Sequence, residues 1–245
     1  MAGDRLLRIL AHLSSGATTE PEPARLCEVC ADVSLMTGAG IMLMTGDVQR
    51  GSVCSSNDVS ALIEELQYTL GEGPCVDAYH EDRPVLEPDL ASQGASRWLA
   101  FASPAVAAGA RAVFGFPLQV GGIRLGALNL YRDQPGPMSE EQFADSLVLA
   151  GLAAQAVLAM QAHASPGALA TELEEGADFR FVVHQASGMV AVQLGVSVGE
   201  ALVRLRAYAF GNDRLLGGVA EAIVARTLRL DNRPLGGGLT VAKSR

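Results

Sequence analysis

The stretch ARAVFGFPLQVGGIRLGALNLY, residues 110–131, carries the strongest structural signal in this sequence. Apolar residues fill both arms, and the pair Gly121-Gly122 separates them. This pattern predicts two antiparallel strands joined by a tight turn. Two flanking segments, 40–44 (GIMLM) and 48–54 (VQRGSVC), are separated by Gly46-Asp47 and predict a second strand pair. A short strand is also expected around Val85-Leu86.

Helical periodicity surrounds these strands. Residues 22–36 repeat apolar side chains at helical spacing, and Gly38 is the expected stop. Residues 61–70 predict another helix, which Asn57-Asp58 or Ser60 would cap and Gly71 would end. A further short helix is expected within 97–109.

The longest predicted helix runs from Ser139 to about His163, and it is apolar on nearly every side. A helix covered by one sheet alone would show a polar stripe. We therefore expect a second partner, most simply the same helix of another protomer. The expected dimer contacts are Leu147, Leu152, Gln155 and Leu158.

Three more helices fit the region from Asp178 onward. The first runs to about Leu194 and closes at Gly195. Ser197 and Glu200 form a capping-box pattern that opens the second, and Asp213 is expected to cap the third. The predicted divisions of the chain are an N-terminal segment (1–24), a sensor domain (25–164), a linker (165–177), a helical domain (178–230) and a loose tail (231–245).

Charge is divided unevenly along the chain. Residues 1–179 hold nine arginines against 23 acidic residues, a balance of −14. Residues 180–245 hold eight arginines and one lysine against four acidic residues, a balance of +5. An acidic body with a basic end is expected when only that end meets a polyanion.

Composition also bounds the class of protein. A hydrophobic fraction of 49% with 18% charged residues indicates a folded chain rather than a disordered one. No secretory signal is visible, and the apolar stretch 146–160 is short for a bilayer span. We expect a cytoplasmic protein without a membrane partner, whose four cysteines stay as thiols.

No catalytic or metal-binding constellation emerges from residue order. Cys27 and Cys30 form a lone CxxC, but a zinc site needs four ligands, and Cys30 falls on an apolar helix stripe. Cys75 could be a redox-sensing thiol in a Gly-Pro loop. His80 could be a haem ligand, although its acidic neighbours favour a surface position. We expect no enzyme activity, no metal and no cofactor.

Residues 25–160 resemble a GAF domain. The resemblance rests on LGEGPC (70–75), RPV (83–85), RW (97–98), FPLQVGG (116–122) and LGALNLY (125–131), in the order seen in actinobacterial regulators. It implies an α+β domain with a six-stranded antiparallel sheet flanked by helices and a pocket for a small molecule or signal. The expected pocket walls are Trp98, Phe101, Phe114, Phe116 and Leu128; the alternative is that these residues belong to the core.

Residues 178–229 resemble an ANTAR domain, an all-α three-helix bundle. The matching residues are Ala186, Gly188, Gly195-Val196-Ser197, Glu200-Ala201, Leu205-Arg206, Ala209, Val219-Ala220 and Ile223. A GAF-ANTAR order implies a transcription antiterminator that holds tandem hairpins of a nascent RNA as a homodimer. Contact with DNA is not expected.

The expected RNA contacts come mainly from arginine. Ser187 stands where many ANTAR sequences carry lysine, and guanidinium groups bind phosphate well. Arg204, Arg206 and Tyr208 are expected to project together toward unpaired bases and phosphates. The remaining candidates are His184, Ser187, Arg214, Arg226 and Arg229. Two alternatives stay open: a docking regulator that works through protein contacts, and a thiol or haem sensor.

Overall fold

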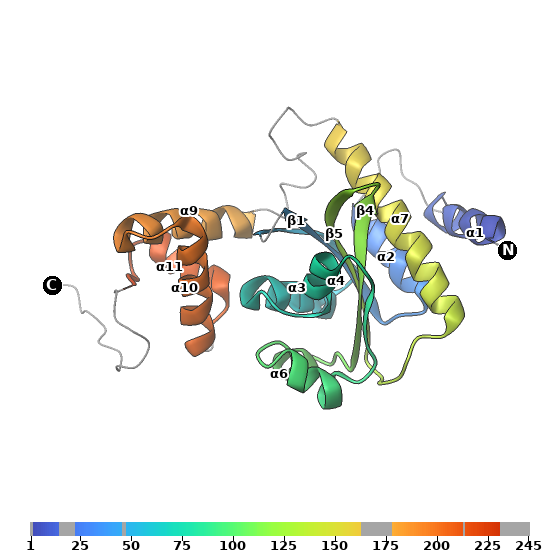
Figure 1. Ribbon diagram of the computed structural model, residues 1–245, viewed down its shortest axis with the longest axis horizontal. Coiled ribbons are helices and arrows are strands. Elements are labelled where there is room, and N and C mark those ends of the chain that lie inside the picture. Colours follow the sequence, from blue (N-terminus) through green and yellow to red (C-terminus); the bar gives the residue numbers. More distant parts are fainter. Residues whose placement is uncertain (1, 15–22, 46–47, 163–177, 213, 231–245) are drawn as a thin grey trace. The chain divides into compact units, whose positions relative to one another are not determined.

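The computed structural model describes residues 2–14, 23–45, 48–162, 178–212 and 214–230. The chain divides into two compact units, 1–178 and 179–245. The first unit contains every strand in the described residues, and the second consists of helices (Figure 1). The expected tail 231–245, the turn residues Gly46-Asp47 and most of the linker lie outside the described residues.

Five strands form one antiparallel sheet in the order β2-β1-β5-β4-β3. The six strands implied by the GAF resemblance are therefore five in the described chain. The strands are β1 (Gly38–Thr45), β2 (Val48–Ser55), β3 (Val85–Glu87), β4 (Ala112–Val120) and β5 (Ile123–Arg132). Both strand pairs and the short third strand predicted from the sequence are confirmed.

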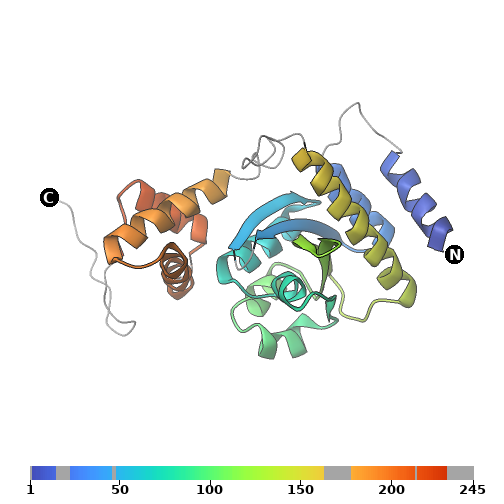
Figure 2. The same cartoon turned by 45° about the horizontal axis from the view of Figure 1, so that its top comes forward.

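Helices cover both faces of the sheet (Figures 1 and 2). On one face lie α2 (Pro23–Ser34) and α7 (Glu140–Ala162), with α1 (Ala2–Ser14) packed on them. On the other face lie α3 (Asp58–Leu70) and α4 (Pro74–Glu81), with α6 (Ala102–Ala107) against α3. The π-helical turn Leu90–Gly94 and α5 (Ala95–Arg97) complete this side.

Side chains of β4 alternate between the two helical layers, as the pleat of a strand requires. Phe114, Phe116 and Leu118 join the core under α2 and α7. Val113 joins the core formed with α3 and α6. Because both faces are covered, nearly every residue of the central strands is apolar, and the hairpin could be recognised from sequence.

Capping residues set the helix ends. Asn57 caps α3 by accepting the Ser60 N–H, with a reciprocal bond from the Asn57 N–H to Ser60 Oγ, and Gly71 at φ 69° ends that helix. Ser139 and Gln142 exchange equivalent bonds at the start of α7. The predicted stop at Gly38 is wrong: α2 ends at Ser34, Leu35 takes the left-handed conformation, and Gly38 opens β1.

The segment 74–81 differs most from its expected form. The sequence predicts no helix there and places Cys75 in a Gly-Pro loop, yet the segment forms α4, with Pro74 at the first helical position and Gly73 preceding it at φ 133°. Proline suits the first turn because that position has no intrahelical bond to lose. The segment is too short and has too few apolar residues for helical periodicity to predict a helix.

One disulfide joins helix α2 to strand β2. Cys27 on α2 is bonded to Cys54 on β2, with their Cα atoms 6.0 Å apart. The expectation that all four cysteines stay as thiols is therefore wrong for this pair. Cys30 and Cys75 are free and fully buried. Sequence spacing could not reveal the bond, because the two residues meet only when α2 packs on the sheet.

The second unit contains α9 (Asp178–Leu194), α10 (Val198–Gly211) and α11 (Leu216–Val224), which contact one another. Gly195 at φ 67° closes α9, and Ser197 caps α10 by accepting the Glu200 N–H, both as predicted. The cap expected at Asp213 is wrong, because Leu215 occupies that position of α11 and supplies no side-chain bond.

One described helix, α7, is long and apolar enough to cross a membrane, and α9 with α10 would qualify only as one span bent by 104°. In this fold α7 packs along β4 and α2. Helices in protein cores are often as long and as apolar as α7.

Candidate functional site

Buried polar side chains gather between the sheet and the α3–α4 layer. Glu64 and Gln67 come from α3, Cys75 from α4 and Asn129 from β5, and each is at most 3% exposed. We call these four residues the buried polar cluster. Polar groups are rarely buried this deeply unless they are hydrogen-bonded or serve a function.

Asn129 lies at the centre of the sheet between two glycines. It stands opposite Gly40 on β1 and opposite Gly115 on β4. A Cβ on Gly40 would overlap the Glu64 carboxylate, and one on Gly115 would lie 2.5 Å from Pro74 O. The missing side chains therefore let α3 and α4 approach the sheet on either side of Asn129.

Gln67 connects α3 to the start of α4. Its Oε1 accepts the backbone N–H of Cys75 at 2.8 Å, which satisfies one of the amides that a helix N-terminus leaves unpaired. A Cβ on Gly73 would lie 2.6 Å from Gln67 Cγ, so this glycine also makes room for the side chain. Glycine is further required there because its φ is 133°.

Asn129 is the unusual member of the buried polar cluster. It is fully buried, and within the described chain neither its Oδ1 nor its Nδ2 has a hydrogen-bond partner. Leaving a buried amide unsatisfied costs about 1–3 kcal/mol. An amide offers two donors and an acceptor, so it could recognise a small molecule that presents both kinds of group.

The cluster does not provide a reactive thiol in this state. Burial raises the pKa of Cys75 far above its usual range, the nearby Glu64 carboxylate raises it further, and the Gln67 hydrogen bond lowers it. Burial also raises the pKa of Cys30 to about 12. Since the thiolate is the reactive form, both cysteines are protonated and inert at neutral pH. Cys75 also lies on a helix, not in the expected loop.

The five predicted pocket residues do not line one pocket. Trp98 and Phe101 lie under the α3 and α6 layer, and Trp98 Nε1 donates to Asp77 Oδ2 at 3.0 Å. Phe114, Phe116 and Leu128 lie on the opposite face of the sheet, beneath α2 and α7. The five residues are thus divided between the two faces of the sheet and pack in two separate parts of the core, so they do not form a shared pocket. The buried polar cluster was missed by sequence reasoning; Asn129 within an otherwise apolar strand was the available signal.

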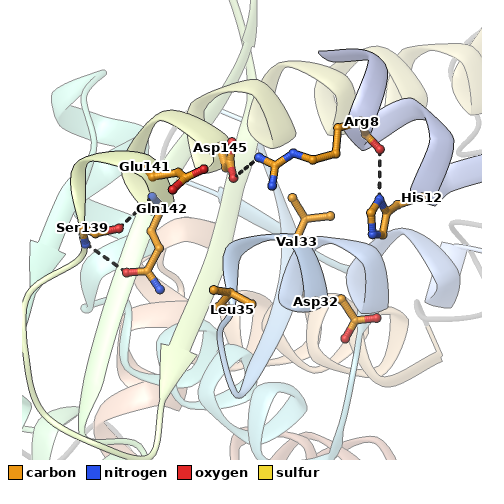
Figure 3. Close-up of a pocket in the computed structure, with 9 residues that line it drawn as sticks. All are labelled: Arg8, His12, Asp32, Val33, Leu35, Ser139, Glu141, Gln142 and Asp145. Atoms are coloured by element: carbon orange, nitrogen blue, oxygen red, sulfur yellow. Dashed lines mark hydrogen bonds and ion pairs between the residues drawn. The ribbon is translucent and has the colours of Figure 1, made fainter. Parts of the chain in front are cut away.

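A surface pocket of about 490 Å³ opens between α1, α2 and the start of α7 (Figure 3). Arg8 reaches across it to Asp145 at 2.6 Å, and Arg5 bonds the other oxygen of the same carboxylate at 2.5 Å. Asp145 is 2% exposed, so this pair of contacts holds α1 onto α7. The Asp145 carboxylate is already bound by two guanidinium groups. We therefore interpret the residues of this pocket as contacts that join the helices.

The two arginines of α10 lie on opposite flanks of that helix. Arg204 and Arg206 are two residues apart, which places them about 200° apart around the helix axis. Arg204 pairs with Glu200 at 2.7 Å, and half-buried Tyr208 shares that flank. Arg206 lies on the other flank with Val203 and Phe210. The expectation that Arg204, Arg206 and Tyr208 project together is therefore wrong.

The other RNA candidates are placed less uniformly. Ser187 is 1% exposed and its hydroxyl donates to Val183 O, so it cannot contact RNA directly, contrary to expectation. His184 is half-buried. Arg214, Arg226 and Arg229 are exposed, and Arg214 donates to Gly218 O at 3.0 Å.

The predicted dimer residues lie on the outer side of α7. Leu147 is 46% exposed, and Gln155 is exposed on the same row two turns later. Leu152 and Leu158 are half-buried at its margins. His80, the haem candidate, is exposed on α4. Within the described ranges no group of three or more His, Cys, Asp or Glu side chains could hold a metal ion.

Comparison with known proteins identifies the first unit. The profile of the GAF domain family matches residues 24–161. Similar solved structures include the GAF domain of a phosphoenolpyruvate-protein phosphotransferase from Acinetobacter, at 17% identity and TM-score 0.48, covering 66% of this chain and 96% of that one. A domain of a putative two-component sensor histidine kinase from Sinorhizobium meliloti has 20% identity and TM-score 0.47, covering 60% and 95%. No curated protein matches this chain.

Proposed function

The chain belongs to the GAF domain family through residues 24–161, and from this premise we propose that it is a signal-responsive regulator whose helical unit binds RNA. The GAF domain is its signal-sensing part, and the helices from Asp178 to Val224 are its output. The proposed output is antitermination: a homodimer holds tandem hairpins of a nascent transcript and keeps a terminator from forming. The protein acts in the cytoplasm and not as an enzyme.

The observation that carries the sensing part is the unsatisfied amide of Asn129. A small molecule that hydrogen-bonds this amide would recover the free energy that burial costs. The cluster is enclosed by close contacts of α3 and α4 with Gly40 and Gly115, so entry of a ligand requires these helices to move. A ligand that prefers the opened arrangement shifts the population toward it.

Charge supports the RNA part of the proposal. Nine basic against four acidic residues in 180–245 give this segment a balance of +5, while the remainder of the chain is strongly acidic. Arg214, Arg226 and Arg229 are exposed on this unit. Exposed guanidinium groups on a small helical unit are suited to phosphate contacts, and the sequence resemblance to ANTAR domains agrees with that use.

The outer side of α7 supports dimerisation. Only 39% of the most apolar stretch of α7 is buried, although this helix packs on β4 and α2. Leu147 therefore presents apolar surface that a second copy of α7 would cover, with Gln155 in the same row. On α1, Leu6, Leu7 and Leu10 are also exposed and would extend the contact.

A docking regulator without RNA affinity is the second candidate. It is favoured by exposed apolar side chains on the helical unit, where Val192 is 88% and Val203 61% exposed. Apolar surface of this kind is typical of protein contacts. Salt separates the two functions, because phosphate contacts weaken steeply as salt rises whereas apolar contacts barely change.

The direct test measures retention of a pool of two-hairpin RNAs by the full chain at about 50 mM and 200 mM salt. The proposal predicts retention at low salt that falls steeply at high salt. A single-stranded RNA of the same length without hairpins is the control for general charge attraction. Failure to retain any hairpin RNA at low salt, by protein with the expected circular-dichroism spectrum, would overturn the RNA function.

A further inference from the structure

Residues 88–111 leave the sheet after β3 and return to it at β4, on the side of α3 and α4 (Figure 1). We call this segment the strap. Glu87 on β3 pairs with Val113 on β4, so both ends of the strap are fixed on neighbouring strands. The strap contains the π-helical turn Leu90–Gly94 and, near its end, Gly109 at φ 104°. Such turns are frequent at functional sites, and glycine adopts backbone conformations that other residues rarely take.

The middle of the strap packs two aromatic rings against α3 and α4. Trp98 is 2% exposed and Phe101 is fully buried, with their rings in edge-to-face contact. They share one apolar core with Ile63 of α3 and Ala78 of α4. Leu99 between them is 79% exposed, so the strap lies at the surface of the domain with these two rings turned inward. The strap is therefore the outer cover of this core.

Two carboxylates hold the strap to the corner where α3 meets α4. Glu72, between the two helices, accepts the backbone N–H of Ala100 at 2.6 Å and that of Phe101 at 2.8 Å, both through Oε1. Asp77, in the first turn of α4, accepts Trp98 Nε1 through Oδ2 at 3.0 Å. Hydrogen bonds to an ionised acceptor are stronger than neutral ones. All three bonds join the strap to the corner, so they break together when the strap lifts.

The far ends of α3 and α4 are tied to the sheet. The Tyr131 hydroxyl donates to Oδ1 of Asn57, the residue that caps α3, at 3.1 Å. Arg124 donates to the backbone oxygen of Tyr79, near the end of α4, at 3.2 Å. Tyr131 and Arg124 both belong to β5. With these ends fixed, the two helices can part from the sheet at their shared corner once the strap releases it.

We propose that the strap is a latch over the sensing site: its release from Glu72 and Asp77 opens the corner between α3 and α4 and gives a ligand access to Asn129. This inference rests on the proposed sensing role of Asn129 and adds how that closed site opens. Cys75 of the buried polar cluster lies just past the corner, one turn before Ala78 of the core under the strap. Opening of the corner therefore exposes the Cys75 thiol as well.

The test needs no ligand, because Cys75 itself reports the opening. Iodoacetamide reacts with a thiol only in the fraction of molecules in which that thiol is exposed. Cys30 is equally buried, but it lies in the separate core beneath α2 and α7 and is an internal reference for that layer. Alkylation of the native full chain is followed over time at each of the two cysteines by mass spectrometry.

Two variants release the strap in different ways. Glu72→Ala removes the acceptor of two backbone amides and is expected to speed alkylation of Cys75 about 10- to 100-fold. Trp98→Phe keeps a ring in the core but removes the donor to Asp77, and a rise of roughly 3- to 10-fold is expected. In both variants the rate at Cys30 should change by less than about 2-fold, because the core beneath α2 and α7 stays closed.

Glu28→Gln is the matched control, because it breaks an exposed ion pair with Arg25 on α2 and should change neither rate. Equal acceleration at Cys30 and Cys75 in the strap variants, or none at Cys75, would overturn the latch and leave sensing through Asn129 standing. The proposed function fails by a different result, the absence of hairpin RNA binding by the wild-type chain, and the alkylation rates are measured without RNA.

Discussion

Gly40 on β1 stands directly opposite Asn129 on β5, and the side chain that Gly40 lacks leaves the space taken by the Glu64 carboxylate. The Glu64 carboxylate thus reaches the surface of the sheet inside the GAF domain because one residue of β1 is a glycine. The same register places Gly115 on the other side of Asn129. These positions make the buried polar cluster testable by small substitutions.

The loss of stability on replacing a sheet glycine by alanine should depend on which atoms the new Cβ would overlap. In Gly126→Ala the Cβ would overlap the backbone oxygen of Met42, which cannot move without disturbing β1. In Gly40→Ala it would overlap only the end of the Glu64 side chain. We expect a loss of unfolding free energy above about 3 kcal/mol for Gly126→Ala and about 1–3 kcal/mol for Gly40→Ala, measured by urea unfolding. Gly122→Ala meets nothing within 4 Å and is the control; an equal cost at Gly40 and Gly122 would contradict the assigned packing.

Asn129→Val should test whether the buried amide serves stability or function. Valine is smaller than leucine and favours strands, so it suits this buried position of β5. The Asn129 amide has no hydrogen bonds to lose within the described chain. We expect unchanged or higher stability, by up to about 2 kcal/mol, together with loss of any response to a ligand. The thermal midpoint of the apo protein reports the first effect. A loss of more than about 2 kcal/mol would mean that the amide is held by a structural partner.

Reduction of the disulfide should weaken the fold without rearranging it. The bond closes a loop between residues 27 and 54, a separation of 27 residues, which corresponds to roughly 3–4 kcal/mol of unfolded-state entropy. The paired variant Cys27→Ser with Cys54→Ser, compared with oxidised wild type by urea unfolding, should show that loss. Iodoacetamide labelling of the unreduced, unfolded chain should modify only Cys30 and Cys75. Labelling of all four cysteines would contradict the bond.

Asp145→Asn should release α1 from the GAF domain. The buried carboxylate accepts from Arg5 and Arg8, and the neutral amide cannot balance two guanidinium groups. We expect a loss of about 1–3 kcal/mol and faster proteolysis within residues 2–14. Glu200→Gln breaks the exposed pair with Arg204 and should cost no more than about 0.5 kcal/mol. Similar costs for the two variants would contradict the buried role of Asp145.

Elements with local signals could be predicted from the order of residues alone. Apolar runs interrupted by Gly121-Gly122 gave the central hairpin, and Asn57, Ser139 and Ser197 marked helix starts because capping depends on neighbouring residues. The acidic body and the basic end are likewise properties of the chain alone. Motif order also placed the GAF domain at nearly the residues that the family profile matches.

Features that depend on which side of a helix or strand a residue faces, and on what covers that side, required the folded chain. It paired Cys27 with Cys54, made a helix of residues 74–81, and sent Phe101 and Phe116 to opposite faces of the sheet. It buried Ser187 and exposed Phe210. The physical reason is that burial and contact between distant segments arise only when α-helices pack on the sheet, and no local pattern encodes the partner.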